Sequence, residues 1–415
     1  MASTKRNFRC RTIPALFALF FFLSAAFPYA DEPAAPNDPA AFPPTIYKPV
    51  PEKWSESRRS WQGISSIEVT SSGRVWLVWY SGGDGEGYEN YLLVATSGDG
   101  GATWSPPFMA LDRDDAIRLF DPELWRDPLG RLWLFWAQGE GSTEPNATGF
   151  QLTCDGRVGV WGMFTENPDA GEDAVWSAPR RLCDGVMMNK PIVDSRGRWL
   201  YPVSIWQIDK PKYILPDDAY GANVYVSTDR GGRLRRLGAP DGKALGTAIN
   251  EHSLVELADG RLWLLARINE GIGEAFSEDG GATWSKMTKT PYKQSPSRTQ
   301  TRRLVSGNIL FLKNGPIEGR DGKDVGRSEI TAFLSEDDGR TWIGGLILDA
   351  RDKVSYPDFG QTPDGVIYAT WDRDRFGEGE ILFARFTEDD VRAGRYVSEK
   401  AVPATVVNRL EKTSK

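Results

Sequence analysis

Polar side chains stand at the start of several dense apolar segments of this 415-residue chain. Counting back nine residues from a glycine in each of six segments gives Ile64, Asp121, Met188, Glu251, Arg298 and Tyr356. Asn189 and Lys190 directly follow Met188 and add two more polar groups. Charged groups in such apolar surroundings are costly unless they pair or meet a ligand. Carboxylates, arginines, a lysine and a tyrosine in one cup have the chemistry of a site for an acidic sugar.

The elements that must position these side chains recur along the chain. A turn glycine followed by an apolar strand occurs at intervals of 47 to 67 residues. The six copies are Gly73 (GRVWLVWY), Gly130 (GRLWLFWAQ), Gly197 (GRWLYPVSIW), Gly260 (GRLWLLAR), Gly307 (GNILFLKN) and Gly365 (GVIYATW). Six units of this length, each with room for about four short strands, predict an all-β, six-bladed β-propeller. The strand before each glycine should then lie innermost.

A second repeat has the pattern S-x-D-x-G-x-T-W, and we call it the octet. It is complete at 97–104, 277–284 and 335–342, lacks its tryptophan at 227–231, and is degenerate at 165–167 and 387–389. We expect its aspartate to accept backbone N–H bonds in a turn, its glycine to take a positive φ and its tryptophan to pack between blades. The octet is therefore predicted to be a structural turn far from the central cup, rather than a calcium or sugar site.

The ends of the chain suggest export. Residues 1–30 combine four basic residues with a short apolar run at 15–27, which is typical of a signal peptide of a secreted or periplasmic protein. An uncleaved anchor is the alternative. We expect a Pro-rich lead-in at 31–54, the propeller at 55–400 and a polar C-terminal tail at 401–415. One end of the chain should complete a shared blade, because a closed ring leaves no free edge.

Composition narrows the possible partners. The net charge is -7, and about -11 without residues 1–30, which argues against nucleic acids and anionic membranes. One histidine, His252, and two cysteines beyond the signal, Cys154 and Cys183, make a metal site or a Ser-His-Asp triad a poor hypothesis. The two cysteines could pair in an exported protein. No nucleotide-binding glycine loop is present, so we expect no cofactor. We also expect a glycan substrate with an acidic sugar and a monomeric protein.

The octet, the six units and the cup together resemble the sialidase (neuraminidase) superfamily, specifically bacterial sialidase-like proteins with Asp-box repeats, over roughly residues 55–392. The order of four residues also fits that superfamily: Glu251, Arg267, Arg327 and Tyr356. The resemblance implies that Tyr356 is a nucleophile, that Glu251 is its base and that the two arginines clamp a substrate carboxylate. A neutral phenol avoids the repulsion that an anionic nucleophile would meet at an anomeric carbon bearing a carboxylate.

Two positions depart from this pattern. Gly63, beside Gln62, stands where the resemblance places the first arginine of a three-member clamp, although Arg58 and Arg59 lie just upstream. The proton donor should come from the loop SGGDGEGYENY, in which Asp84, Glu86 and Glu89 are candidates. We select Glu89, since a glutamate whose pKa is raised by a closed site can act as a general acid.

Further polar residues are candidates for substrate binding, each with a structural alternative as an ion pair or a buried hydrogen-bonded group. They are Gln62, Arg118, Asp121, Asn189, Lys190, His252 and Arg298. The leading hypothesis is a sialidase-like glycoside hydrolase that removes a terminal acidic sugar. A propeller rhamnosidase or rhamnosyl-glucuronate lyase acting next to a uronic acid is the second, and in the lyase His252 or Tyr356 would be the base. A non-catalytic glycan-binding propeller is the third.

Overall fold

The computed structural model describes residues 38–141, 158–206, 217–246, 250–269, 271–317 and 326–411. The expected signal peptide at 1–30 and Cys154 lie outside these residues, so both the export hypothesis and the disulfide stay predictions. Among the residues that the structure describes, no helix is long and apolar enough to cross a membrane. All elements described below belong to the unit from Asp31 to Lys415.

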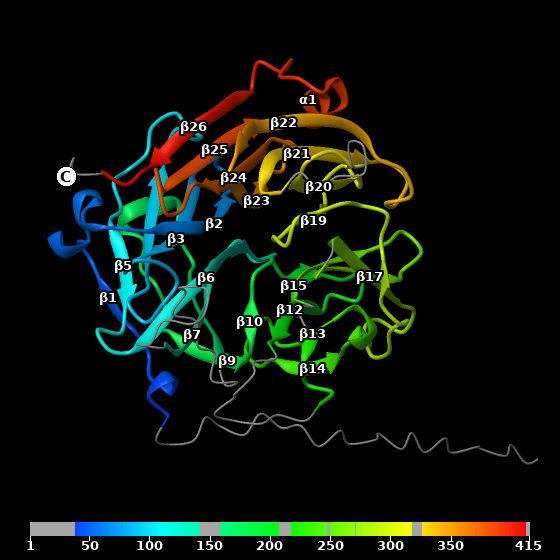
Figure 1. Ribbon diagram of the computed structural model, residues 1–415, viewed down its shortest axis with the longest axis horizontal. Helices are drawn as coiled ribbons and strands as arrows, with labels where there is room; N and C mark the ends of the chain where they lie inside the picture. Colours follow the sequence, from blue (N-terminus) through cyan, green and yellow to red (C-terminus); the bar gives the residue numbers. More distant parts are fainter. Residues whose placement is uncertain are drawn as a thin grey trace, which may run out of the picture. The chain divides into compact units, whose positions relative to one another are not determined.

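Six antiparallel sheets surround a common axis, which confirms the predicted all-β, six-bladed propeller (Figure 1). Blade 1 contains β1 (Thr45–Tyr47), β2 (Gln62–Val69), β3 (Val75–Ser81), β4 (Tyr91–Ser97) and β5 (Met109–Asp112). Blade 2 contains β6 (Ile117–Arg126), β7 (Leu132–Glu140), β8 (Gly159–Thr165) and β9 (Arg180–Asp184). Blade 3 contains β10 (Val186–Met187), β11 (Ile192–Val193), β12 (Trp199–Ile205), β13 (Gly221–Ser227) and β14 (Arg235–Gly238).

The second half of the chain repeats this plan. Blade 4 contains β15 (Asn250–Glu256), β16 (Leu262–Ile268), β17 (Gly271–Ser277) and β18 (Thr288–Lys289). Blade 5 contains β19 (Gln300–Arg303), β20 (Ile309–Asn314), β21 (Ser328–Ser335) and β22 (Ile343–Asp352). Blade 6 contains β23 (Val354–Gln361), β24 (Ile367–Arg373), β25 (Glu380–Phe386) and β26 (Val402–Asn408). The helices are short: η1 (Pro39–Ala41), η2 (Glu52–Trp54), η3 (Glu56–Arg58), η4 (Pro168–Asp173), η5 (Lys243–Leu245) and α1 (Glu388–Ala393).

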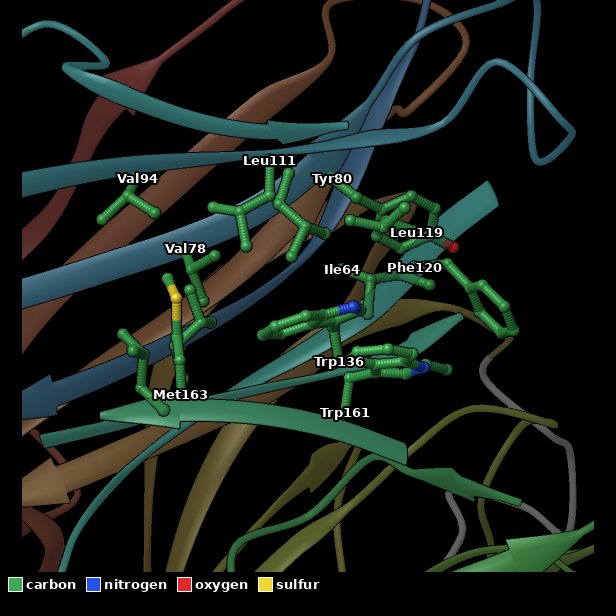
Figure 2. Close-up of a cluster of buried hydrophobic side chains, with 14 of the residues drawn as sticks. Ile64, Val78, Tyr80, Val94, Leu111, Leu119, Phe120, Trp136, Trp161 and Met163 are labelled. Atoms are coloured by element: carbon green, nitrogen blue, oxygen red, sulfur yellow. The ribbon is translucent and has the colours of Figure 1, made fainter. Parts of the chain in front are cut away.

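The turn glycines explain why the sheets repeat. Each joins the innermost part of its blade to the next strand outward. Each also has a φ between 74° and 93° and donates its N–H to the carbonyl three residues earlier at 2.8–3.1 Å. Glycine adopts this left-handed backbone at little cost, whereas most residues with a Cβ resist it. The apolar strand that follows packs against neighbouring blades. One such core between blades 1 and 2 holds Trp136 and Trp161 stacked 6.3 Å apart (Figure 2).

The octets form turns between the third and fourth strands of their blades, as predicted. In Asp99, Asp279 and Asp337, one carboxylate oxygen accepts the backbone N–H of the octet threonine at 2.8–2.9 Å. The other oxygen accepts the threonine hydroxyl at 2.6–2.7 Å. Trp104 packs on Phe383 of blade 6 with ring centroids 5.4 Å apart, so the tryptophan does join blades. Both carboxylate oxygens are therefore occupied by the turn itself.

The ends of the chain differ from the expectation. β1, in the expected lead-in, pairs with the outer strand β5, and β26 runs through the segment expected to be a tail. No blade is shared, because each sheet is built from consecutive strands within the described residues. Side chains close the ring instead: Ile64 N–H donates to Asp372 at 2.8 Å and Ser65 bonds Thr370 at 2.8 Å. Edge strands thus remain at the outer rim of each blade.

Candidate active site

A pocket with a volume of about 690 Å³ opens around the axis at the start of the innermost strands. This volume falls in the usual range for small-ligand sites, about 300–1,000 Å³. Five of the six residues expected to face the centre line it, and Arg298 does not. The full lining is Ile64, Glu86, Asp121, Met188, Trp206, Asn250, Glu251, Arg267, Arg327, Lys353, Ser355, Tyr356, Asp374, Arg375 and Phe376.

A backbone irregularity aims four of these side chains at the pocket. Ile64, Asp121, Glu251 and Tyr356 have φ values of 48–55°, and the strand pairing shifts register beside each of them. Bulges of this kind redirect a side chain, and left-handed residues other than glycine cost about 1–3 kcal/mol each. Ile64 is the most unusual of the four, because β-branched residues rarely take a positive φ. The ring of blades therefore holds four equivalent strained positions at the mouth of its axis.

Tyr356, Glu251 and Arg267 form one hydrogen-bonded group. The Tyr356 hydroxyl donates to Glu251 Oε1 at 2.7 Å, and Arg267 Nη1 lies 3.2 Å from the same hydroxyl oxygen. Arg267 Nη1 also donates to Glu251 Oε1. Glu251 Oε2 is buried and has no hydrogen-bond partner among the residues that the structure describes, so one carboxylate oxygen remains available. The four residues singled out by order along the chain are thus brought together, because Arg327 lines the same pocket.

The electrostatic setting of Tyr356 combines opposing effects. Burial, together with the Glu251 carboxylate, raises the pKa of Tyr356 above its usual value, while Arg267, Arg327 and Arg375 act to lower it. The guanidinium carbons of Arg375 and Arg327 lie 4.4 Å and 5.3 Å from the centre of the tyrosine ring. A phenol that is neutral at rest has here a carboxylate that can accept its proton and three cations that stabilise its deprotonated form, which is the setting of an activated nucleophile.

Arg375 is the pocket-lining arginine that the sequence analysis missed. Its side chain lies against Gly63, where an added Cβ would come within 2.7 Å of Arg375 Cγ and Cδ. Arg58 and Arg59, the arginines considered as replacements at this position, are absent from the lining. Arg375 lies two residues after the end of β24, and Arg267 is the last residue but one of β16, so arginines near the ends of second strands were the available signal.

Two carboxyl groups besides Glu251 are candidate proton donors. Burial raises the pKa of Asp121 to about 7, with the charge of Glu86 adding to the effect. Glu86 itself is paired with Arg375 at 3.3 Å. Glu89, selected from the sequence, is exposed and absent from the lining. The reason is the loop, in which Asn90 bonds the backbone of residues 82, 85 and 87 and leaves Glu86 on the pocket side.

Lys190 and Arg298 lie below the pocket rather than in it. The residues two places after the six central positions form a second ring across the axis: Ser66, Glu123, Lys190, Ser253, Gln300 and Asp358. Lys190 Nζ donates to Glu123 and Asp358 at 2.8 Å each, and all three side chains are fully buried. Gln300 bonds Asp358 at 2.7 Å and Ser66 joins Glu123 and Asp358. We call this ring the axial plug.

Arg298 ties the plug to the pocket. It donates to the carbonyls of Met188, Ser65 and Tyr356 at 2.7–3.0 Å and reaches Glu123 at 3.3 Å. Within the plug, burial raises the pKa of Glu123 to about 7, with Asp358 adding to it. Burial also opposes ionisation of Asp358, yet Lys190 and Arg298 outweigh it and lower the pKa of that carboxyl. Lys190 and Arg298 therefore form ion pairs between inner strands, which was the structural alternative to a role in substrate binding.

Four other expected site residues are buried outside the lining. Gln62 links β2 to Asn408 of β26 at 3.0 Å, and Asn189 donates to the Glu251 carbonyl at 3.1 Å. His252 bonds the Asn223 carbonyl at 2.8 Å and Ser204 at 3.2 Å, and burial lowers its pKa to about 4. Arg118 stacks on Phe120, 3.9 Å from the ring centre, and its buried nitrogens have no hydrogen-bond partner in the described ranges.

These positions correct the expected cup. The bulges turn Asp121, Glu251 and Tyr356 toward the pocket. Because side chains of a strand alternate between faces, His252 packs between blades, and Lys190 lies further down the axis. Among the described residues, no cluster of three or more histidines, cysteines or carboxylates could hold a metal ion. The site is instead an arginine-rich pocket around one buried tyrosine and its carboxylate partner.

A six-bladed propeller with Asp-box turns and such a pocket defines the sialidase type of protein. A family model described as a BNR repeat-like domain matches residues 54–369, and the chain belongs to this family. It is similar to the sialidase of Micromonospora viridifaciens, with 24% identity over 364 residues that cover 77% of this chain and 52% of the relative. The chain therefore spans about half the length of this relative.

Two solved structures share the fold. The Hadza microbial sialidase Hz136 has a TM-score of 0.62 at 17% identity, and the match covers 81% of this chain and 67% of that one. The intramolecular trans-sialidase from Ruminococcus gnavus, solved with oseltamivir carboxylate, has a TM-score of 0.59 at 16% identity. That match covers 86% of this chain and 99% of the trans-sialidase. At such identities the likeness concerns the fold alone.

Proposed function

We propose that this protein is a sialidase-like glycoside hydrolase that releases a terminal sugar whose anomeric carbon bears a carboxylate. One observation carries the proposal: the Tyr356 hydroxyl is 2.7 Å from Glu251, and both are buried in a pocket lined by arginines. Arg267 and Arg327 would hold the substrate carboxylate, since guanidinium groups match carboxylates by paired hydrogen bonds. The resemblance to sialidases and the carboxylate-bearing ligand of the Ruminococcus gnavus structure support the same substrate class.

The first chemical step is attack on the anomeric carbon by the Tyr356 oxygen. Its proton passes to Glu251, and the glycosidic bond breaks as the leaving alcohol takes a proton from an acid. We assign that acid to Asp121, because its pKa of about 7 keeps much of it protonated at neutral pH. Water then attacks the same carbon from the side of Asp121, whose carboxylate takes a proton from that water, and the bond between the sugar and the Tyr356 oxygen breaks. Glu251 returns its proton to Tyr356, so the anomeric configuration is retained.

The alternative of a uronate lyase loses support from the same geometry. It needed His252 or Tyr356 to take a proton, and the arginines together with Lys190 to neutralise a carboxylate. His252 has both ring nitrogens engaged by Asn223 and Ser204, and Lys190 is committed to the axial plug. A lyase would therefore depend on Tyr356 as its base and on the arginines of the pocket as its cations.

Product analysis tests the proposal. Purified protein would be incubated with sialylated and uronate-containing oligosaccharides, and the products read by mass spectrometry. We expect free sialic acid from the wild type and a loss of about 10²–10⁴-fold in kcat for Tyr356→Phe, the range for a lost proton-transfer or nucleophilic group. Tyr292→Phe is the matched control, because that hydroxyl bonds Trp342 at 2.9 Å outside the pocket.

Other product patterns would contradict the proposal in different ways. An unsaturated uronate product would make the protein a lyase, and a neutral sugar released next to a uronate would make it a rhamnosidase. Binding of acidic glycans with no product from any of them would leave a recognition module. Equal activity of Tyr356→Phe and the wild type would remove Tyr356 from the chemistry.

A further inference from the structure

The space beside Gly63 is filled by an arginine from a different blade. A Cβ added to Gly63 would lie 2.7 Å from Cγ and Cδ of Arg375 and 2.8 Å from its Nε. Gly63 stands in β2 of blade 1, whereas Arg375 follows β24 of blade 6. Any side chain at position 63 would collide with the middle of the arginine stem, so the observed position of Arg375 requires glycine at 63.

Arg375 is one of three pocket-lining guanidiniums around one phenol, and a fourth, that of Arg298, lies below the pocket 5.6 Å from the centre of the same ring. Its Cζ lies 4.4 Å from the centre of the Tyr356 ring, closer than that of Arg327 at 5.3 Å. Arg267 Nη1 approaches the hydroxyl of the same tyrosine at 3.2 Å. Three cations converge here on a residue that is neutral at rest. Glu251 balances the charge of Arg267, and Asp372 and Glu86 balance that of Arg375, so a ligand carboxylate would meet cations that fixed carboxylates already hold in place.

One edge of Arg375 is fixed and the other is exchangeable. Nη2 donates to Asp372 at 2.8 Å and to Ser355 at 3.2 Å, which locks the guanidinium plane. Nη1 has only a long contact of 3.3 Å with Glu86. The Arg375 side chain is 7% exposed, so its charge acts in a partly dry site. A ligand carboxylate could replace Glu86 at Nη1 without moving the arginine.

We propose that Arg375 is the third arginine of the carboxylate clamp and that it reaches the site from blade 6 in place of an arginine at position 63. This assignment rests on the proposed function, since it concerns the same carboxylate. The clamp of this chain is then Arg267, Arg327 and Arg375. Glu86 holds Arg375 until substrate arrives.

Binding to a matched pair of probes tests the inference without requiring turnover. The probes are N-acetylneuraminic acid and its methyl ester, titrated calorimetrically. Arg375→Met keeps much of the stem volume and removes the charge. We expect about 10- to 100-fold weaker binding of the acid, the usual effect of losing one charge-assisted bond, and less than about 3-fold change for the ester. Arg375→Lys, which keeps the charge but not the planar fork, should fall between the two.

Two further variants separate a clamp from a structural role. Arg373→Met is the control two residues earlier in the chain. Arg373 bonds Glu380 at 3.1 Å outside the pocket lining, so this variant should leave the affinity for both probes unchanged. The double variant Gly63→Arg, Arg375→Ala moves the guanidinium back to blade 1. We expect it to recover most of the preference for the acid, whereas Gly63→Arg alone should lower the melting temperature through collision.

The outcomes distinguish this inference from the function it rests on. A wild type that binds the acid no better than the ester would overturn both the proposed function and the clamp. A wild type that prefers the acid, with the same preference in Arg375→Met, would overturn only the assignment of Arg375. Equal loss of acid and ester in both Arg375→Met and Arg375→Lys would mean that Arg375 merely supports the fold.

Discussion

The Tyr356 hydroxyl and the Glu251 carboxylate meet at 2.7 Å although 105 residues separate them in the chain. They come from blades 6 and 4, and each sits at the same place in its blade, with φ values of 55° and 49°. The pair is therefore built by one local device used twice, a bulge at the start of an innermost strand. Two strained positions give two side chains a shared direction, toward the axis and toward each other.

Glu251→Gln should abolish proton transfer while keeping the hydrogen bond to Tyr356. We expect kcat for release of the terminal sugar to fall by about 10²–10⁴-fold with little change in KM, because glutamine cannot accept the proton. Glu256→Gln, at the other end of β15 and bonded to Ser195 at 2.7 Å, should leave kcat unchanged. Steady-state kinetics of both variants check this, and equal losses would point to damage of the strand rather than loss of a base.

The basic limb of the pH profile should follow Asp121. A proton donor works only while protonated, so kcat/KM should fall as the pH rises through its pKa of about 7. The charge of Glu86 raises that pKa and the charge of Arg118 lowers it. Glu86→Gln should thus move the limb to lower pH and Arg118→Met to higher pH, each by about half to one unit.

This pair of opposite shifts is measured as kcat/KM between pH 4 and 9. Asp121→Asn should remove the limb together with most of the activity. A limb that persists in Asp121→Asn would transfer the donor role to another group, with Glu86 the first to test. Shifts of the same sign in the two variants would show that the limb does not report Asp121.

Lys190→Met should destabilise the protein strongly. It leaves Glu123 and Asp358 buried without their shared cation, and breaking such a buried pair costs about 3–5 kcal/mol. Lys400→Met is the matched comparison, because Lys400 pairs with Asp364 at 2.7 Å on the surface with side chains 54% and 61% exposed. Its loss should cost less than about 1 kcal/mol. Urea unfolding monitored by tryptophan fluorescence measures both, and equal free energies of unfolding would refute the role given to the plug.

Asp337→Ala tests the octet as a turn rather than a ligand site. Removing the carboxylate frees the Thr341 N–H and hydroxyl that it now binds, at a cost to stability of about 1–2 kcal/mol. Catalytic activity and glycan binding should be unchanged, because the turn lies outside the pocket lining. A loss of glycan affinity with an unaltered melting temperature would instead assign the octet to recognition.

The repeats made the fold predictable from the sequence. Each turn glycine closes the same bond to the carbonyl three residues back, so the same letters return in every blade. The order of Glu251, Arg267, Arg327 and Tyr356 along the chain was enough to gather the core of the candidate pocket. Repeated sequence patterns mark the turns and strands of each blade, and these elements fix where the four residues lie.

Depth along the axis could not be read from the sequence. Lys190 lies two residues beyond Met188, roughly 7 Å further along the strand, and so falls in the plug rather than the pocket. Arg375 was missed for another reason: only its place near the end of a second strand marks it in the sequence, and its contact with Gly63 joins blades 6 and 1. Glu86 and Glu89 differ only through the fold of one loop, which Asn90 determines.

The axial plug has a consequence for how substrate and products travel. With Ser66, Glu123, Lys190 and Asp358 bonded across the axis, the pocket has no passage through this ring of side chains, and a polymer cannot be threaded through it. Under the proposed function, a sugar at the end of a chain would enter the pocket, and both products would leave it, through the same mouth. The leaving alcohol would then have to clear that mouth before water could reach the sugar, so the two products would depart in a fixed order. A small alcohol waiting there would compete with water for the sugar, and transfer to acceptors would follow as a side reaction.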